Sequence, residues 1–296
     1  MHPPVEGDAD LFEAVADAHD ACLGRYPHGT MEVFAERGEL EPLRPDVRVE
    51  CKFDWLGTNH HVKGRFTNFL TQKDGKTKEA TDEIETVLSE KLYQVYDATL
   101  HHLRICSPNA GLIPLTKLQP DRSWYTILGQ PWTFPLRDPG YQAEVERYEV
   151  RRPDAKTVEI VSFRKGGVTE TTKASLDWDW HVVEYHIRDA QKGDASGTFL
   201  WDRDRKGRVF LRERMATMPA RGARIYEKLR VKSFDPDYQP PKSLFLSRIK
   251  PAAGTTVDDE IAHRRYRVGD TPVEAMGNRL DKLIELMRSE GFARPR

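Results

Sequence analysis

Most of the chain alternates between apolar and polar residues with a period of two, the pattern of a β-strand with one buried and one solvated face. In the segment 47–55 charged residues separate the apolar positions, which are Val47, Val49, Cys51, Phe53 and Trp55. Residues 59–70 are expected to form its hairpin partner across Leu56-Gly57-Thr58. Further strands are predicted at 84–89, 92–97, 100–106, 143–151, 156–164, 180–188, 196–201, 208–214 and 225–233.

Two segments follow the helical period instead. Apolar residues recur at helical spacing over residues 11–23, which predicts an N-terminal helix. Near the C-terminus, Thr271, Pro272 and Glu274 form a helix start signal, and an apolar stripe follows over residues 276–287. These two helices are expected to flank the strands at either end of the chain.

The order of these elements predicts the fold class. Strands follow one another at intervals of roughly ten residues with almost no helix between them, which excludes a parallel βαβ sheet. We expect a mainly β fold, a curled antiparallel sheet that forms an open half-barrel, with N-terminal and C-terminal helices. The sheet domain is expected to span residues 1–269, and a C-terminal helix and tail residues 270–296. Proline-rich segments at 108–141 and 235–255 are predicted to be long crossings.

Acidic and basic residues nearly cancel over the whole chain, 47 against 46, but they are unevenly distributed. Residues 203–232 are rich in arginine and lysine, and the candidate basic strip there comprises Arg208, Arg212, Arg214, Arg224 and Lys228. Two interpretations are open. The charges can form a solvated face that protects sheet edges, or they can face an anionic partner such as lipid head groups or nucleic acid. We expect no nucleic acid partner.

The sequence contains Cys22, Cys51 and Cys106. This sparse, odd set excludes a disulfide scaffold and a cysteine-based zinc site. A Cys51–Cys106 bridge is compatible with an oxidising compartment, and three buried free thiols are favoured over it. No apolar run is long enough to span a membrane, and the first residues lack the pattern of a secretory signal. We therefore expect either a periplasmic or otherwise extracytoplasmic protein whose signal was removed, or a cytoplasmic one.

Asp46, Glu50 and Lys52 resemble the carboxylate-x-lysine signature of metal-dependent nucleases. Alternation places the three side chains on one face, where two carboxylates can hold Mg²⁺. A solvated face gives the same pattern, and the crossover helices of such nucleases are missing from the prediction. A metal-dependent nuclease or hydrolase therefore remains an alternative hypothesis.

Two histidine pairs, His60-His61 and His101-His102, are the next candidates. Neighbours on a strand point to opposite faces, so neither pair is expected to bind one metal by itself. One histidine from each pair can meet across strands near Asp97, but a third and a fourth ligand are not identifiable. Ordinary surface or cross-strand histidines are favoured.

The segment Asp177-Trp178-Asp179-Trp180 combines paired carboxylates with tryptophans, as sugar-processing sites do. Strand alternation would place both carboxylates on one face and both tryptophans on the other, so that the acids face water. The sequence also lacks the nucleophile elbow, the P-loop, the dinucleotide fingerprint and the His-Glu-x-x-His motif. We assign no catalytic residue, no metal ligand and no cofactor.

Several large apolar residues share the predicted inner faces of the strands. A curled sheet of this width needs either helices that fill it or a cavity that holds a ligand. The residues are an ordinary core in the first case and a ligand cavity in the second. The candidate cavity residues are Phe53, Trp55, Phe66, Phe69, Tyr93, Val95 and Trp180.

The order of these segments resembles the outer-membrane lipoprotein carriers (LolA/LolB-like) and their larger secreted bacterial relatives. The resemblance covers roughly residues 10–269 and rests on the order of the segments rather than on an invariant motif. The resemblance begins with the N-terminal helix. The segments that carry it after this helix are Thr30 to Phe34, Val47 to Trp55, Thr86 to Asp97, Ser243 to Phe245, Gly254 to Asp259 and Tyr266 to Gly269. The family implies an open sheet that holds acyl chains between its concave face and the helices.

From this resemblance we expect an extracytoplasmic, non-catalytic protein that binds a lipid or a lipoprotein. Its expected partner is an acyl chain or a lipoprotein, with peripheral membrane contact through the basic strip, and we expect a monomer. A structural interaction module of the cell envelope is a second alternative. The sequence identifies neither the ligand nor the role of the 108–141 crossing.

Overall fold

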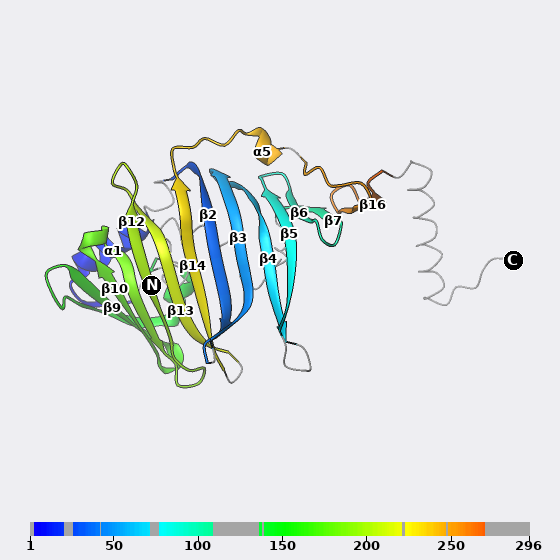
Figure 1. The fold of residues 1–296 in the computed structure, drawn as a ribbon. Coiled ribbons are helices and arrows are strands. Elements are labelled where there is room, and N and C mark those ends of the chain that lie inside the picture. Colours follow the sequence, from blue (N-terminus) through cyan, green and yellow to red (C-terminus); the bar gives the residue numbers. More distant parts are fainter. Residues whose placement is uncertain are drawn as a thin grey trace.

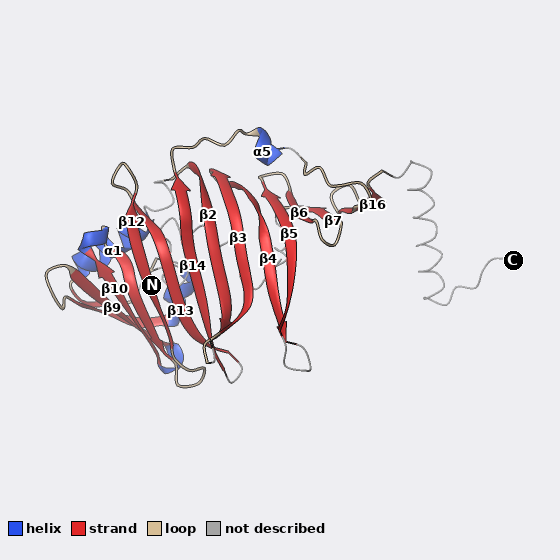
Figure 2. Ribbon diagram, viewed as in Figure 1, coloured by secondary structure: helices blue, strands red, loops and turns tan. Residues whose placement is uncertain are grey.

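The computed structural model describes residues 3–20, 26–41, 43–71, 77–108, 136–137, 139–220, 223–246 and 248–269. Within these residues, sixteen strands form one sheet in the order β1-β8-β9-β10-β11-β12-β13-β14-β2-β3-β4-β5-β6-β7-β15-β16. The sheet is curled and does not close on itself (Figures 1 and 2). The predicted mainly β fold and open half-barrel are therefore confirmed.

The first run of strands comprises β1 (Val5–Gly7), β2 (His28–Glu39), β3 (Arg44–Leu56), β4 (Asn59–Thr71), β5 (Thr77–Leu88), β6 (Tyr93–Asp97) and β7 (His102–Cys106). The second comprises β8 (Val145–Arg151), β9 (Thr157–Arg164), β10 (Val168–Ser175), β11 (His181–Arg188), β12 (Ala195–Arg203), β13 (Val209–Ala220) and β14 (Ala223–Asp235), followed by β15 (Thr256–Asp259) and β16 (Arg264–Arg267). The helices are α1 (Ala9–Asp20), α4 (Pro139–Glu144) and α5 (Ser243–Leu246), with 3-10 turns η1 (Lys165–Gly167) and η2 (Leu176–Trp178).

One long-range pairing joins the two runs of strands. β14 pairs antiparallel with β2, so that Val231 lies opposite Val33 and Leu229 opposite Ala35. Most other pairs are hairpins of neighbouring strands, as the alternation predicts. The pairings β1–β8 and β15–β7 are parallel.

The predicted N-terminal helix is confirmed from Ala9 to Asp20, and Phe12, Val15 and Ala16 are buried against the β8–β10 end of the sheet. The expected C-terminal helix, Cys22 and most of the 108–141 crossing lie outside the described residues. No helix in the described part of the chain is both long and apolar enough to cross a membrane.

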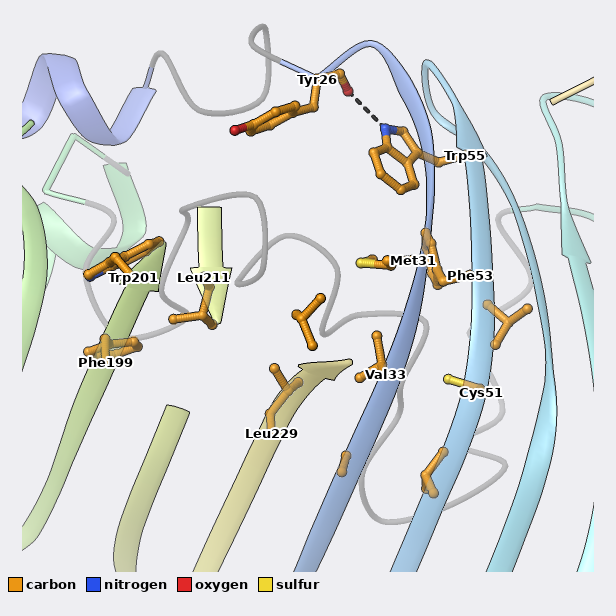
Figure 3. Packing of buried hydrophobic residues seen from close by; sticks show 14 of the residues in the cluster. Tyr26, Met31, Val33, Cys51, Phe53, Trp55, Phe199, Trp201, Leu211 and Leu229 are labelled. Carbon is orange, nitrogen blue, oxygen red and sulfur yellow. Dashed lines mark hydrogen bonds between the residues drawn. The ribbon is translucent and has the colours of Figure 1, made fainter. Parts of the chain in front are cut away.

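The main core lies on the inner face of the curve, where side chains from both runs of strands point toward one another (Figure 3). We call this cluster the inner apolar surface. Its buried members are Tyr26, Met31, Val33, Ala35, Val49, Cys51, Phe53, Trp55, Val62, Phe66, Ile84, Val182, Tyr185, Phe199, Trp201, Val209, Leu211, Leu229 and Val231.

The second predicted crossing lies on the other face of the sheet. We call residues 236–246 and 248–255 the outer strap. It leaves the end of β14, passes the upper ends of β2 and β3, includes α5 and leads to β15 (Figure 1). Ile249 of the strap packs with Leu103, Ile105 and Val257, and its backbone N–H donates to Gln94 Oε1 at 3.0 Å. The strap therefore covers the outer face near β6 and β7.

Candidate functional site

The inner apolar surface extends across both runs of strands, from β11 to β14 and from β2 to β5. Its members and the residues packed against them come from strands, from the η2 turn and from the segment before β2. Among the described residues, no α-helix contributes to this cluster, because α1 and Tyr141 of α4 pack in the separate cluster over β8–β10. Residues of the sheet therefore form the inner apolar surface.

Aromatic side chains concentrate at one rim of this surface. Phe234 stacks on Phe210 with ring centroids 4.4 Å apart, and it contacts Trp55 and Tyr26 at 6.0 and 5.1 Å. Trp55 Nε1 donates a hydrogen bond to the Tyr26 carbonyl oxygen at 2.9 Å (Figure 3). Tyr26 Oη in turn donates to the carbonyl oxygen of Val209 at 3.0 Å. The two hydrogen bonds connect β3 with β13 and give Trp55 Nε1 and Tyr26 Oη their partners. What remains of the aromatic group at the rim is mainly apolar.

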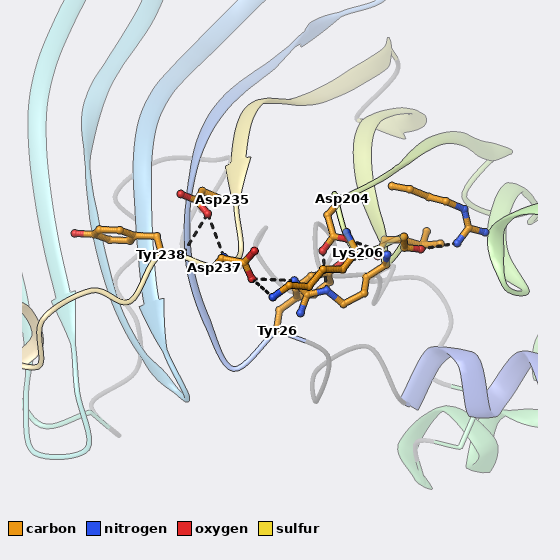
Figure 4. Close-up of polar contacts among 10 residues, drawn as sticks. Tyr26, Asp204, Lys206, Asp235, Asp237 and Tyr238 are labelled. Atoms are coloured by element: carbon orange, nitrogen blue, oxygen red, sulfur yellow. Dashed lines mark hydrogen bonds and ion pairs between the residues drawn. The ribbon is translucent and has the colours of Figure 1, made fainter.

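Ion pairs hold the outside of the same rim (Figure 4). Lys206 donates to Asp237 at 2.5 Å, and Arg208 donates to Asp204 at 2.6 Å and lies 3.5 Å from Asp237. The hydrogen bond from Lys206 holds the pKa of Asp237 below its usual value. The Arg208 guanidinium also lies 4.9 Å from the ring centroid of Tyr26. This network fastens the β12–β13 turn to the chain that leaves β14.

A group of charged side chains interrupts the inner face at the far end of the apolar surface. Arg214 pairs in register with Phe199 on one side and with Leu229 on the other, so it shares their face. Arg37 and Glu227 lie directly opposite each other on β2 and β14. Glu227 is 3.5 Å from Arg37 and 3.8 Å from Arg214. Sequence reasoning placed Arg214 in the basic strip and did not single out Arg37 or Glu227.

The candidate cavity residues are only partly brought together. Phe53, Trp55 and Phe66 belong to the inner apolar surface. Tyr93 and Val95 lie farther along the same face in a small cluster with Cys106. The other two candidates lie elsewhere.

Phe69 is three residues from Phe66 and therefore points to the outer face, where the Arg48 guanidinium lies 5.2 Å from its ring centroid. Trp180 packs against the cluster beneath α1. The assignment of Phe69 to the inner face is therefore wrong.

The expected alternation over residues 177–180 is also wrong. This segment is not a strand but includes the end of the η2 turn, after which Asp179 and Trp180 have φ angles of 53° and 62°. The two left-handed residues turn the chain, so Trp178 packs against the inner apolar surface while Trp180 does not. Arg203 stabilises the turn through both carboxylate oxygens of Asp179, at 3.1 and 3.2 Å.

The five residues of the predicted basic strip do not form one surface. Arg208 lies at the rim and Arg214 on the inner face, as described above. Arg212 is 3.1 Å from Asp202, Lys228 is 3.6 Å from Glu213, and Arg224 donates to Thr217 at 3.4 Å. The basic residues that are close together in the sequence therefore lie on different faces of the sheet, and several of them are paired with acidic side chains.

The candidate nuclease residues lie on the outer face or at a register shift. Glu50 is 2.7 Å from Lys232, whose hydrogen bond lowers the pKa of that carboxyl group, and Lys52 is 3.5 Å from Asp54. Asp46 falls between the paired positions Val47 and Pro45, where the β2–β3 register shifts. In the described ranges, no group of three or more His, Cys, Asp or Glu side chains is placed to hold a metal ion.

The histidine pairs are not brought together either. His61 lies 2.9 Å from Glu85 and 3.6 Å from Asp54, whereas His102 lies 2.8 Å from Asp258. Cys51 and Cys106 are both free and buried, so the structure contains no bridge between them.

No protein-family model matches the sequence, and no curated protein matches it. The solved structures that are similar in their arrangement include the following three. A LolA superfamily protein from Nitrosomonas europaea gives a TM-score of 0.41 with 7% identity, over 78% of this chain and 96% of that chain. A DUF1329 family protein from Desulfovibrio piger gives 0.37 with 10% identity, over 79% and 96%. An uncharacterized conserved protein from Thermus thermophilus gives 0.33 with 13% identity, over 84% and 98%.

One of these structures is from the LolA superfamily, the family that the order of the sequence segments resembles.

Proposed function

We propose that this chain is a non-catalytic lipid or lipoprotein carrier that works outside the cytoplasm and binds acyl chains along the inner apolar surface. One observation carries the proposal. A continuous apolar surface, rich in aromatic side chains, lies on the inner side of a sheet that does not close, and in the described residues no helix contributes to it. Burial of each methylene of an acyl chain contributes about 0.8 kcal/mol, so a long chain along such a surface supplies ample binding energy.

The rim provides the features that a carrier needs at its opening. The aromatic group around Phe234 is apolar, while the ion pairs of Lys206 and Arg208 with Asp237 and Asp204 keep the outside of the rim polar. Of these ion pairs, the one between Lys206 and Asp237 has both side chains exposed, at 61% and 51%. Single ion pairs at exposed positions contribute little to stability, about 0–1 kcal/mol. In the proposed function this ion pair opens during ligand entry at small cost, while Asp204, whose side chain is 5% exposed, holds Arg208 in place.

The proposal is tested by ligand binding to the purified chain. The neutral fluorophore N-phenyl-1-naphthylamine is added, and its displacement by 1-dodecanol is followed. We expect saturable displacement together with a rise in the melting temperature, because a ligand that binds only the folded state stabilises it. Absence of fluorophore binding and of any thermal shift would contradict the proposal and favour a structural interaction module.

A photoreactive probe locates the bound chain. After irradiation with an alkyl diazirine, peptide mapping is expected to find the label on β2, β3, β13 or β14 at inner positions such as Val33 and Leu229. Outer positions of the same strands, such as Lys228 and Arg230, are the internal control. Label that concentrates on the outer face would disprove the proposed site.

A further inference from the structure

The charged group at the end of the inner apolar surface has an excess of positive charge. Arg37 and Arg214, here called the inner arginine pair, face one carboxylate, that of Glu227. Their side chains are 25% and 15% exposed, and that of Glu227 is 22% exposed. Among the described residues, Glu227 is the one acidic side chain that forms an ion pair with either arginine. Three charges that sum to plus one therefore lie where the neighbouring inner positions are apolar.

Arg214 also hydrogen-bonds the hydroxyl group of Tyr185, and further donor capacity remains on both arginines. Each guanidinium carries five N–H donors in a planar fork. The distances of 3.5 and 3.8 Å to Glu227 are at or beyond the limit of a direct hydrogen bond. The Glu227 carboxylate thus balances part of the positive charge of the two arginines and leaves N–H donors of both guanidinium groups available. Planar guanidinium groups of this kind bind carboxylate and phosphate oxygens in pairs.

One line of paired positions leads from Glu227 across the neighbouring strands to Tyr185 and Thr172. Glu227 lies opposite Ala216, Ala216 opposite Gly197, Gly197 opposite Tyr185, and Tyr185 opposite Thr172. Two of these positions carry the small residues glycine and alanine. Thr172 Oγ1 is buried without a hydrogen-bond partner among the described residues. Thr172 is on β10, four strands away from Glu227 on β14, so its hydroxyl group does not belong to the charged group.

We infer that the inner arginine pair binds the anionic head group of a single-chain amphiphile, a carboxylate or a phosphate monoester, whose tail lies on the adjoining inner apolar surface. Charge complementarity supports this occupant. One added negative charge neutralises the group of Arg37, Arg214 and Glu227, and the apolar members Leu229 and Phe199 begin next to Arg214 in register. The inference rests on the proposed function, because it names the class of lipid that the same surface takes.

The test compares three competitors for N-phenyl-1-naphthylamine. Dodecanoate has the tail and the charge, 1-dodecanol has the tail alone, and acetate has the charge alone. We expect dodecanoate to bind the unaltered chain at least tenfold more tightly than 1-dodecanol, and acetate not to compete. Arg214→Gln and Arg37→Gln should each weaken dodecanoate about tenfold, the range of one charge-assisted hydrogen bond, and leave 1-dodecanol unchanged.

Two further variants sharpen the result. Glu227→Gln removes the competing carboxylate and should tighten dodecanoate binding, the direction opposite to the arginine variants. Arg230→Gln, on the outer face of β14 where Arg230 pairs with Glu213 at 2.6 Å, is the matched control and should change neither ligand. Melting temperatures of all variants identify any that fail to fold.

The outcomes separate the two proposals. Equal binding of dodecanoate and 1-dodecanol that is indifferent to Arg214→Gln and Arg37→Gln would overturn the inference and leave the proposed function intact. Binding of neither ligand would overturn both. Competition by acetate as strong as that by dodecanoate would show a site for small anions and would overturn the amphiphile as its occupant.

Discussion

His60 and His61 are neighbours on β4 but lie on opposite faces of the sheet, and their pKa values shift in opposite directions. His60 is buried on the inner face, where its ring stacks on Phe53 with centroids 5.5 Å apart, and burial lowers its pKa to about 4. His61 lies on the outer face beside Asp54 and Glu85. Burial acts to lower the pKa of His61, but hydrogen bonds with Asp54 and Glu85 outweigh it and raise that pKa.

The outer histidine should stabilise the fold mainly at acidic to neutral pH. Its pKa in the folded chain lies above the ordinary 6.5, so its contribution is complete below 6.5 and is lost as the pH rises through the folded value. We expect His61→Gln to reduce the free energy of unfolding more at pH 6 than at pH 9, as measured by urea denaturation. Arg65→Gln on the same face is the control, because an arginine side chain stays charged at both pH values. An equal loss in the free energy of unfolding for His61→Gln at both pH values would contradict the raised pKa of His61.

The inner histidine should have the opposite effect. Because the pKa of His60 falls from 6.5 to about 4 on folding, stability is lost as the pH falls through this interval. The variant His60→Phe keeps an aromatic ring against Phe53 and has no proton to bind. Its advantage over the unaltered chain should be small at pH 7.5 and reach about 2 kcal/mol near pH 4.5. Denaturation curves at the two pH values measure the difference in the free energy of unfolding between the variant and the unaltered chain. A difference that does not change with pH would refute the prediction.

Glu170 is a buried carboxyl group whose substitution should stabilise the chain above neutral pH. Burial raises its pKa to about 7, and it accepts a hydrogen bond from Tyr141 at 3.1 Å. The folded state therefore holds a proton at this site, and the associated stability is lost as the pH rises from 4.5 through 7. Glu170→Gln, which is always neutral, should raise the free energy of unfolding by up to about 3 kcal/mol at pH 8.5 and change it little at pH 4.5. Glu146→Gln, an exposed change on β8, should show no such pH dependence.

Gly29 is required by the position of Trp55. A Cβ atom at residue 29 would lie 2.4 Å from the indole ring of Trp55, which is fully buried and held by its hydrogen bond to Tyr26. Gly29→Ala should lower the free energy of unfolding by about 1–3 kcal/mol, the usual cost of overpacking a core. In the double variant with Trp55→Leu the two losses should be less than additive. If thermal or urea denaturation shows that the losses in free energy of unfolding simply add, the Cβ atom at residue 29 does not clash with the Trp55 ring.

Much of the fold follows from local patterns in the sequence. The alternation over 47–55 identifies β3 and its inner face, and the turn Leu56-Gly57-Thr58 identifies the hairpin with β4. The prediction fails where backbone conformation rather than hydrophobicity decides the direction of side chains. Asp179 and Trp180 have left-handed backbone conformations, and the segment contains no glycine that would signal them. Phe69 is misplaced for a simpler reason, because it is three residues from Phe66 on the same strand and alternation itself puts the two rings on opposite faces.

The sequence by itself determined most of the strands, the open antiparallel sheet and the N-terminal helix, because side-chain periodicity and turn residues act over a few neighbouring positions. It did not predict β10, Val168–Ser175, which lies between β9 and β11. Only the tertiary structure decided which charges meet. The pairing of β14 with β2 brings Glu227 to Arg37 and Arg214, residues that no local pattern connects. Strand register over such a separation depends on the packing of the whole sheet, and so the candidate head-group site became visible only in three dimensions.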